Sequence, residues 1–302
     1  MFSAKVKSFA KINLSLNISG VRDGYHLIDS VVAGIDVYDT VCAKPRRDSL
    51  VNVYMHGLGS EEIPPERNNA VRAGEAFVSA FGTRGADIEI YKDIPMGAGL
   101  GGSSADAAGV LNALAKLYKI KDGAALGAIA ASLGSDTAYM LGGGYARLTG
   151  RGEKVETLSS PRPYCFLLFL PKTPVSTAEC YREYDRMPDP LRADSAALSA
   201  ALARGDFAGV AANVYNALQR PACALNPEVC EALEAARSFS PSACAVTGSG
   251  SAVFALFESV ELCRWAKSRY RGKMKTRVAV AAPTKTFLLR NPFVLSEEEK
   301  GL

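Results

Sequence analysis

A glycine-rich loop between a strand and a helix constrains this chain more than any other feature. Four glycines fall within six positions of the segment from Pro95 to Ser104. The residues before it, Asp87 to Tyr91, alternate apolar and polar side chains as a half-buried strand does. After it, apolar residues recur with helical spacing from Ala107 to Leu117. The sequence therefore predicts a contiguous strand, glycine loop and helix.

Such a loop is typical of an anion site. Glycines leave several backbone N–H groups open to an anion, and the start of a helix adds partial positive charge. A serine is expected to cap the helix, with Asp106 in its first turn. Ser103 or Ser104 could also offer a hydroxyl to a phosphate or to Mg²⁺. The plainer alternative is a turn that only joins the strand to the helix.

Two common nucleotide-binding motifs do not account for the loop. The P-loop pattern requires a lysine after its last glycine, whereas Ser103 follows Gly102. The loop formally matches GxGxxG, but no acidic residue ends a second strand about twenty residues later. Lys119 and Lys121 stand there instead. The loop therefore indicates a phosphate site on another kind of fold.

The first predicted strand carries a candidate cation. Apolar residues alternate from Ile12 to Ile18, which puts Lys11 and Asn13 together on the opposite face. The charged turn that follows contains the pair Tyr25-His26. This pair could stack on a ring and hydrogen-bond to it, and the alternative is a surface turn with an aromatic anchor.

Asp136 is a candidate general base. Phosphoryl transfer mainly needs charge placed around the γ-phosphate and a group that accepts the proton of the nucleophile. Asp136 follows Gly134-Ser135 in an apolar segment, and the alternative role of its side chain is that of a helix N-cap. Lys11 could neutralise developing charge or keep Asp136 ionised. A solvated lysine on the strand is the alternative.

The sequence indicates neither a metal centre nor a disulfide framework. The seven cysteines are odd in number and contain no CxxC pair. Neither histidine, His26 or His56, has a cysteine or histidine partner at metal-ligand spacing. Cys180 lacks a nearby base in the sequence, so a structural thiol is expected. Reduced thiols, with no signal peptide or apolar span, predict a cytoplasmic protein without a membrane partner.

The length of 302 residues exceeds the usual size of one hydrophobic core, so two domains are expected. The segment from Ser159 to Pro163 is the predicted boundary, which divides residues 1–160 from residues 161–302. The second half begins with a buried-type strand, Tyr164 to Leu170, and continues with alanine-rich helical segments. The 35 basic residues are dispersed among 31 acidic ones, which argues against a nucleic-acid partner.

Three separated segments resemble, in order along the chain, the motifs of the GHMP kinases. Residues 95–105 are similar to the central ATP-binding motif, Thr247 to Phe254 to the C-terminal glycine motif, and Ala10 to Leu14 to the N-terminal motif. The resemblance implies an α+β, two-domain GHMP kinase fold. Its N-terminal domain would be ribosomal-protein-S5-like and its C-terminal domain ferredoxin-like. It also implies transfer of a phosphoryl group from ATP, with Mg²⁺, to a small-molecule alcohol.

Four shorter motifs are similar to those of one branch of this family, whose substrate is cytidine diphosphate methylerythritol. They are AKINLSL at residues 10–16, DGYH at 23–26, GSD at 134–136 and VST at 175–177. By this resemblance, Lys11 and Asp136 form the catalytic pair. The residues implied in ATP binding are Asn68, Pro95, Met96, Gly97, Ala98, Gly99, Leu100, Gly101, Gly102, Ser103, Ser104 and Ala105. The residues implied in substrate binding are Asn13, Tyr25, His26, Thr177 and Tyr181.

Two other functions stay open. A related kinase could act on a mevalonate-type or homoserine-type alcohol, although a base-stacking Tyr25-His26 pair has little use there. A ligand sensor of the same fold would lack the base or the lysine, and both are present. Members of the branch usually carry valine and proline after the aspartate, whereas this chain has Thr137-Ala138. Without the proline the turn is less constrained. The sequence indicates no oligomeric state.

Overall fold

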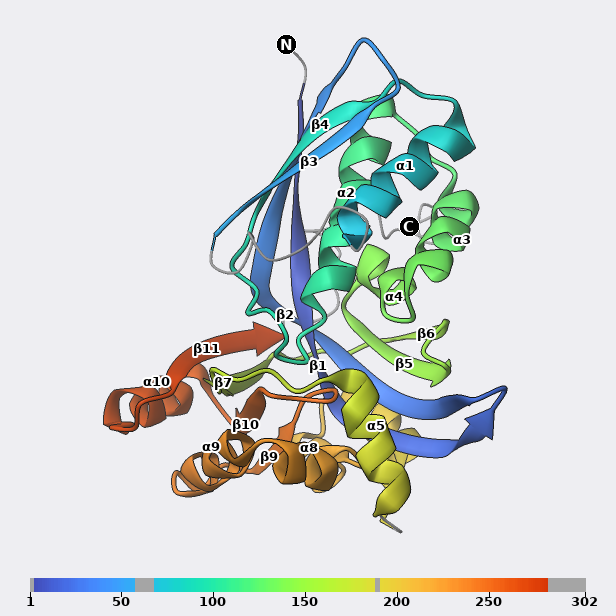
Figure 1. Ribbon diagram of the computed structural model, residues 1–302. Helices are drawn as coiled ribbons and strands as arrows, with labels where there is room; N and C mark the ends of the chain where they lie inside the picture. The colour runs from blue at the N-terminus through green and yellow to red at the C-terminus, as the bar shows by residue number, and fades with distance from the viewer. Residues whose placement is uncertain (1–2, 58–67, 188–190, 282–302) are drawn as a thin grey trace.

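The computed structural model contains two β-sheets with helices packed against them (Figure 1). It describes residues 3–57, 68–187 and 191–281. Helices and strands are mixed along these ranges, which confirms the predicted α+β class. Within them, no helix has both the length and the apolar character that a membrane span requires.

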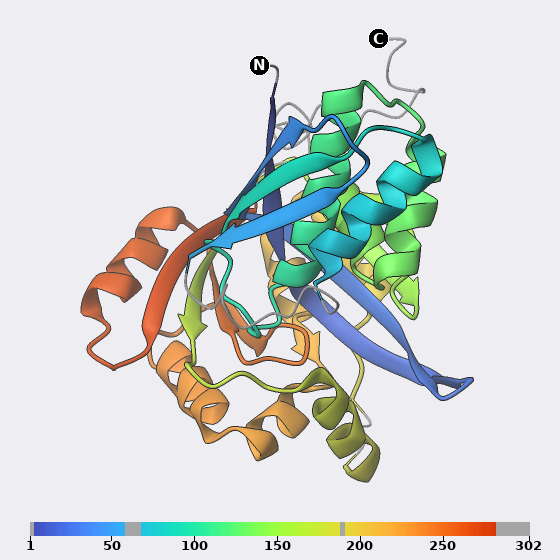
Figure 2. The ribbon, with the colours of Figure 1, turned by 45° about the horizontal axis from the view of Figure 1, so that its top comes forward.

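The first sheet has seven strands. Their order is β3-β4-β2-β1-β8, and β5 pairs with β2 and with β6. The strands are β1 (Ala4–Arg22), β2 (Tyr25–Pro45), β3 (Val51–His56), β4 (Ala86–Tyr91), β5 (Tyr145–Gly150), β6 (Lys154–Leu158) and β8 (Tyr215–Asn216). Helices from the first half of the chain lie to one side of the long strands (Figure 2). They are α1 (Asn69–Phe81), α2 (Gly102–Tyr118), α3 (Gly123–Leu133) and α4 (Thr137–Gly142).

Strands β1 and β2 form one long hairpin that carries the charged turn. Asp23 and Gly24 make the turn with φ values of 52° and 77°, as a tight two-residue hairpin turn requires. Arg22 therefore faces Tyr25 across the hairpin. The register shifts at three places along the pair, one of them between Phe9 and Lys11. Such bulges turn the strand and re-aim side chains.

The second sheet has the order β11-β7-β10-β9. Its strands are β7 (Tyr164–Leu170), β9 (Ala243–Val246), β10 (Val253–Phe257) and β11 (Lys275–Ala281). The helices of this half are α5 (Thr177–Arg186), α6 (Ser195–Arg204), α7 (Phe207–Ala212), α8 (Gln219–Leu225), α9 (Pro227–Arg237) and α10 (Val260–Arg269). Strand β7 has its predicted bounds and is buried throughout, because its alternating side chains pack into a different apolar cluster on each face of the sheet.

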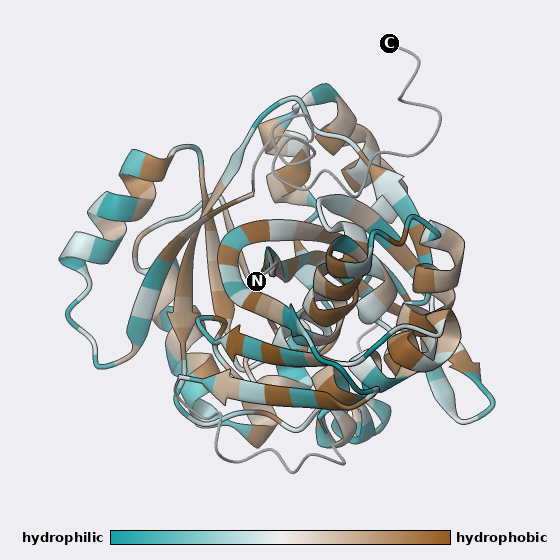
Figure 3. Ribbon diagram, turned by 90° about the horizontal axis from the view of Figure 1, so that it is seen from above, coloured by the Kyte–Doolittle hydropathy of each residue, from teal (hydrophilic) through white to brown (hydrophobic). Residues whose placement is uncertain are grey.

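The two halves of the chain share their core. Strand β8, from the second half, pairs in parallel with β1 of the first sheet. One cluster of buried apolar residues joins Ile12 and Val32 of the first sheet to Phe166 and Phe254 of the second. Seen from above, brown apolar segments lie toward the interior and teal polar ones mostly toward the rim (Figure 3). The division at residues 160 and 161 stays a prediction.

The start of helix α2 differs from its prediction. Its N-cap is Gly101, in the left-handed conformation with φ 77°, and the helix begins at Gly102. No serine therefore caps it, because the serines already lie inside its first turn. Asp106 lies beyond that turn and is buried. The glycine N-cap leaves the hydroxyls of Ser103 and Ser104 available for other contacts.

Candidate active site

A cavity of about 860 Å³ is lined by segments from both halves of the chain. Its lining includes every predicted site residue except Ala105. Ala105 is fully buried, and its N–H donates to the Gly101 carbonyl at 2.8 Å within α2. The fold thus gathers residues that are far apart in the sequence at one place, while their roles stay predictions.

The glycine loop needs its glycines for both backbone conformation and space. Gly97, Gly99 and Gly101 have φ values of 62°, 74° and 77°, a region that other residues rarely adopt. A Cβ on Gly99 would lie 2.1 Å from the Thr247 carbonyl oxygen, and one on Gly101 would lie 2.3 Å from Cε of Met140. The loop is therefore packed closely against its neighbours.

Backbone hydrogen bonds fix the loop between β1 and the β9–β10 turn. The Lys11 N–H donates to the Leu100 carbonyl at 3.0 Å, and the Ala252 N–H donates to the Ala98 carbonyl at 3.1 Å. A third contact links β1 to the same turn, since the Asn13 N–H donates to Thr247 Oγ1 at 3.0 Å. These three hydrogen bonds join the glycine loop, strand β1 and the β9–β10 turn into one framework.

Lys11 and Asp136 lie next to each other in this cavity. Lys11 Nζ is 3.5 Å from Asp136 Oδ2 and donates to Asn13 Oδ1 at 2.6 Å. The Lys11 side chain is 5% exposed and that of Asp136 is 30% exposed, so the lysine is not the solvated residue that the alternative supposed. Asp136 occupies the N-cap position of α4, but among the described residues its side chain makes no capping hydrogen bond. Its carboxylate is thereby available to the cavity.

The start of α1 lies beside the loop helix. Asn68 caps α1, because its Oδ1 accepts the Ala70 N–H at 3.0 Å. Asn69 Nδ2 donates to Ser103 Oγ at 3.1 Å. Ser104 Oγ lies on another side, 3.9 Å from the position that a Cβ on Gly134 would take. The two serines are thus directed differently: Ser103 toward α1, and Ser104 toward the segment that carries Asp136.

Aromatic side chains gather at the other end of the cavity. The rings of His26 and Tyr181 are 4.8 Å apart, and His26 Nε2 lies 2.7 Å from Asp185 Oδ1. Tyr25 is exposed, and the Arg151 guanidinium covers its ring at 3.7 Å. Burial raises the pKa of Tyr181, and the negative charge of Asp136 adds to the rise. The Tyr181 phenol therefore stays neutral.

Several cavity residues were missing from the sequence prediction. Lys92 and Asp106 line the cavity, and Ser249 Oγ lies 2.9 Å from Thr177 Oγ1. The C-terminal glycine motif was a signal for the Ser249 turn, and Lys92 lies three residues before Pro95, where the loop begins. Asp39, which contacts Lys92, had no signal, because it lies inside a strand of 21 residues.

Among the described residues, protein side chains alone form no metal-binding cluster, and the cysteines are free thiols. Within the described residues, no group of three His, Cys, Asp or Glu side chains could hold a metal ion. None of the seven cysteines, all of which are described, forms a disulfide. Burial raises the pKa of Cys180 to about 12, so its thiol is protonated near neutral pH and unsuited to act as a nucleophile. The expectation of a structural thiol fits this environment.

Comparisons with known proteins agree with this geometry. The GHMP kinases N terminal domain matches residues 68–145, and the GHMP kinases C terminal domain matches residues 198–263. A homoserine kinase from Cytophaga hutchinsonii shares the fold, with a TM-score of 0.71 at 20% identity over 93% of this chain and 95% of that one. The two domain matches and the shared fold define a kinase of the GHMP group.

Relatives with higher sequence identity indicate which branch of the GHMP kinases the chain belongs to. Two 4-diphosphocytidyl-2-C-methyl-D-erythritol kinases are each 38% identical to this chain. The match to the one from Pelotomaculum thermopropionicum covers 87% of this chain and 92% of that relative. The match to the one from Streptomyces coelicolor covers 82% of this chain and 85% of that relative. A crystal structure of 4-(cytidine 5'-diphospho)-2C-methyl-D-erythritol kinase matches with a TM-score of 0.76 at 32% identity, covering 92% of this chain and 99% of that one. The chain belongs to the 4-diphosphocytidyl-2-C-methyl-D-erythritol kinase family.

Proposed function

We propose that this protein transfers the γ-phosphoryl group of ATP to the 2-hydroxyl of 4-diphosphocytidyl-2-C-methyl-D-erythritol, which gives the 2-phosphate and ADP. The observation that carries the proposal is the 3.5 Å contact between Lys11 and Asp136 in the cavity that the glycine loop lines. Relatives of known name over most of the chain support the choice of substrate.

Asp136 is the proposed general base. Its carboxylate accepts the proton of the attacking hydroxyl while Lys11 neutralises charge that develops at the transferred group. Asn13 holds Lys11 in place, because its Oδ1 accepts from Nζ at 2.6 Å and its Nδ2 donates to Ser30 Oγ at 2.8 Å. A lysine fixed before the reaction stabilises charge without reorganisation.

The glycine loop is the proposed site of the triphosphate. Its left-handed glycines expose backbone N–H groups at the start of α2, where the helix favours negative charge. The nearby oxygen donors suit Mg²⁺, which prefers hydroxyl, carboxylate and phosphate ligands. We assign Ser104 to the metal, since Ser103 is bonded to Asn69. When bound, Mg²⁺ would neutralise phosphate charge.

The aromatic end of the cavity is the proposed cytidine site. Tyr25, His26 and Tyr181 offer ring faces and edges to a base, which suits a cytidylated substrate better than mevalonate or homoserine. Asn13 and Thr177 would complete the substrate site. We also propose the cytoplasm as its location, since seven cysteines without a disulfide are typical of a reducing compartment.

The substitution Asp136→Asn tests the proposed base. We expect kcat to fall by about 10²- to 10⁴-fold, because a general base contributes about that much, with little change in ATP affinity. Asp122→Asn is the matched control: Asp122 caps α3 and accepts the Ala125 N–H at 2.9 Å, and asparagine caps equally well. Turnover of Asp136→Asn equal to that of the control would refute the assignment.

A coupled assay of ADP release tests the substrate. The panel is the cytidylated alcohol, mevalonate and homoserine. We expect ADP with the first alone. Release with one of the other two would indicate a different GHMP kinase, and no release with any of them, under conditions where ATP binds, would favour a ligand sensor.

A further inference from the structure

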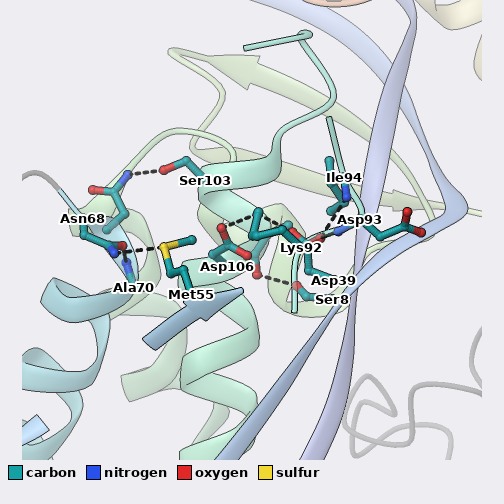
Figure 4. Close-up of polar contacts among 12 residues, drawn as sticks. Ser8, Asp39, Met55, Asn68, Ala70, Lys92, Asp93, Ile94, Ser103 and Asp106 are labelled. Carbon is teal, nitrogen blue, oxygen red and sulfur yellow. Dashed lines mark hydrogen bonds and ion pairs between the residues drawn. The ribbon is translucent and has the colours of Figure 1, made fainter. Parts of the chain in front are cut away.

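Three charged side chains form a buried cluster beneath the glycine loop (Figure 4). The Lys92 ammonium contacts the Asp39 carboxylate and lies 2.5 Å from Asp106 Oδ2. The exposed fractions of the side chains are 3% for Lys92, 0% for Asp39 and 5% for Asp106. Removing charges from water costs about as much as their pairing returns. Stability alone therefore gives little reason for such a cluster.

The three residues come from elements on both sides of the loop. Lys92 follows β4 on the entry side, and Asp106 lies in α2 on the exit side. Asp39 belongs to β2, and its Oδ1 accepts the N–H groups of Asp93 at 2.6 Å and Ile94 at 2.8 Å. Both ends of the loop are thereby tied to the same strand of the first sheet.

Asp106 also has an unpaired oxygen. Its Oδ1 is buried without a hydrogen-bond partner among the described residues, although Asp106 lines the cavity. Burial raises the pKa of Asp106 to about 8 against the opposing effect of Lys92, and Asp39 adds to the rise. The neighbour from β1 is uncharged, since Ser8 donates its hydroxyl to the Ala105 carbonyl. The cluster is thus close to neutral while Asp106 keeps its proton.

We propose that Lys92, Asp39 and Asp106 are positioning residues that hold both ends of the glycine loop in the conformation that receives the triphosphate. The inference rests on the proposed function, because it requires ATP at this loop. Without Lys92, Asp39 would be a buried carboxylate without its cation, and the contact that joins Asp39 to Asp106 of α2 would be lost. The entry segment and α2 would then no longer be held together. The backbone N–H groups of the loop would then no longer converge on one anion.

The substitution Lys92→Met removes the ion pairs of Lys92 with Asp39 and Asp106. We expect the affinity for a non-hydrolysable ATP analogue, measured by calorimetry, to fall by about 10- to 100-fold, because loss of one hydrogen bond to a charged group weakens binding by about that factor. The KM for the alcohol should stay within about threefold of the parent value. Arg147→Met is the matched control, because it breaks the Arg147–Asp29 pair of 2.8 Å outside the cavity lining, and it should keep the ATP affinity.

Two results of this experiment would overturn the proposal. One is an unchanged ATP affinity in Lys92→Met. The other is a loss of kcat alone with both substrate affinities intact, as a smaller folded fraction would produce. A parent protein that binds the analogue but phosphorylates no cytidylated alcohol would instead sink the proposed function, and the binding comparison would still be interpretable.

A second variant covers the case in which Lys92→Met does not fold. Asp106→Asn keeps the shape of the side chain but cannot ionise. In the parent, the KM for ATP should rise from about pH 7 to about pH 9, because loss of the Asp106 proton leaves a net negative cluster facing the triphosphate. The variant should show a flat profile. A parent without this rise, or a variant with the same rise, would contradict the positioning role.

Discussion

Gly99→Ala would show how closely the glycine loop must fit the β9–β10 turn. A Cβ on Gly99 would lie 2.1 Å from the Thr247 carbonyl oxygen and 3.0 Å from that of Gly250. The first of these oxygens cannot easily move away. Asn216 Nδ2 donates to the carbonyls on both sides of it, Val246 at 2.7 Å and Gly248 at 2.8 Å. The glycine loop and the β9–β10 turn must therefore move apart by about 1 Å before the distance between the Cβ and this oxygen approaches van der Waals contact.

Two costs follow from this geometry. Alanine at φ 74° loses about 1–2 kcal/mol of unfolding free energy through its left-handed backbone. The separation of about 1 Å moves the loop relative to Lys11, whose N–H is bonded to Leu100, and a misplacement of that size costs about 10²-fold in rate. We expect steady-state kinetics to give a fall in kcat/KM of about 100-fold, and thermal denaturation to give a lower Tm.

Gly82→Ala separates the two costs. Gly82 has φ 61°, and a Cβ there would have no heavy atom within 4 Å. It therefore carries the backbone strain without the collision, and it lies at the end of α1, outside the cavity lining. This control should lose stability but keep its kcat/KM. If Gly99→Ala had a kcat/KM within about threefold of the control, the packing argument would be refuted.

Two further outcomes can be checked on single variants. Tyr181→Ala removes the ring that lies 4.8 Å from His26. The KM for the cytidylated alcohol should rise by about tenfold, as expected when a base loses a stacking partner. An equal rise in the KM for ATP would contradict the assignment of a cytidine site. Asp106→Asn should become more stable relative to the parent as the pH rises from about 5 to about 8. The reason is that the folded parent holds the Asp106 proton up to about pH 8, whereas the unfolded chain releases it near the ordinary value of 3.8. Melting curves with a constant difference between the two proteins would contradict it.

Local patterns predicted most of the elements around the site. Strand β7 was predicted with its observed bounds because a continuous apolar run is a strong local signal. The loop was predicted from its glycines, because glycine is the residue that readily adopts the left-handed backbone conformation. The capping serine was wrong for a related reason, since Gly101 in the left-handed conformation had already taken the N-cap.

Contacts over long sequence distances could not be predicted in this way. Asp39 lies in β2 without any distinctive neighbour in the sequence, and it becomes important only where Lys92 and two backbone N–H groups reach it. The alternative roles of Asp136 were equally balanced in the sequence. The position of Lys11, 125 residues earlier and 3.5 Å away, distinguishes a carboxylate directed at a cation from a capping one.

The amino-acid sequence sufficed for the phosphate loop, the α+β class and the family, because these depend on residue types and spacings along the chain. The fold was needed to show that Lys11, Asp136 and the loop share one cavity, and that a buried ion cluster ties down both loop ends. The physical reason is that burial and charge pairing depend on distances between segments. Those distances exist only after the two sheets have packed against each other.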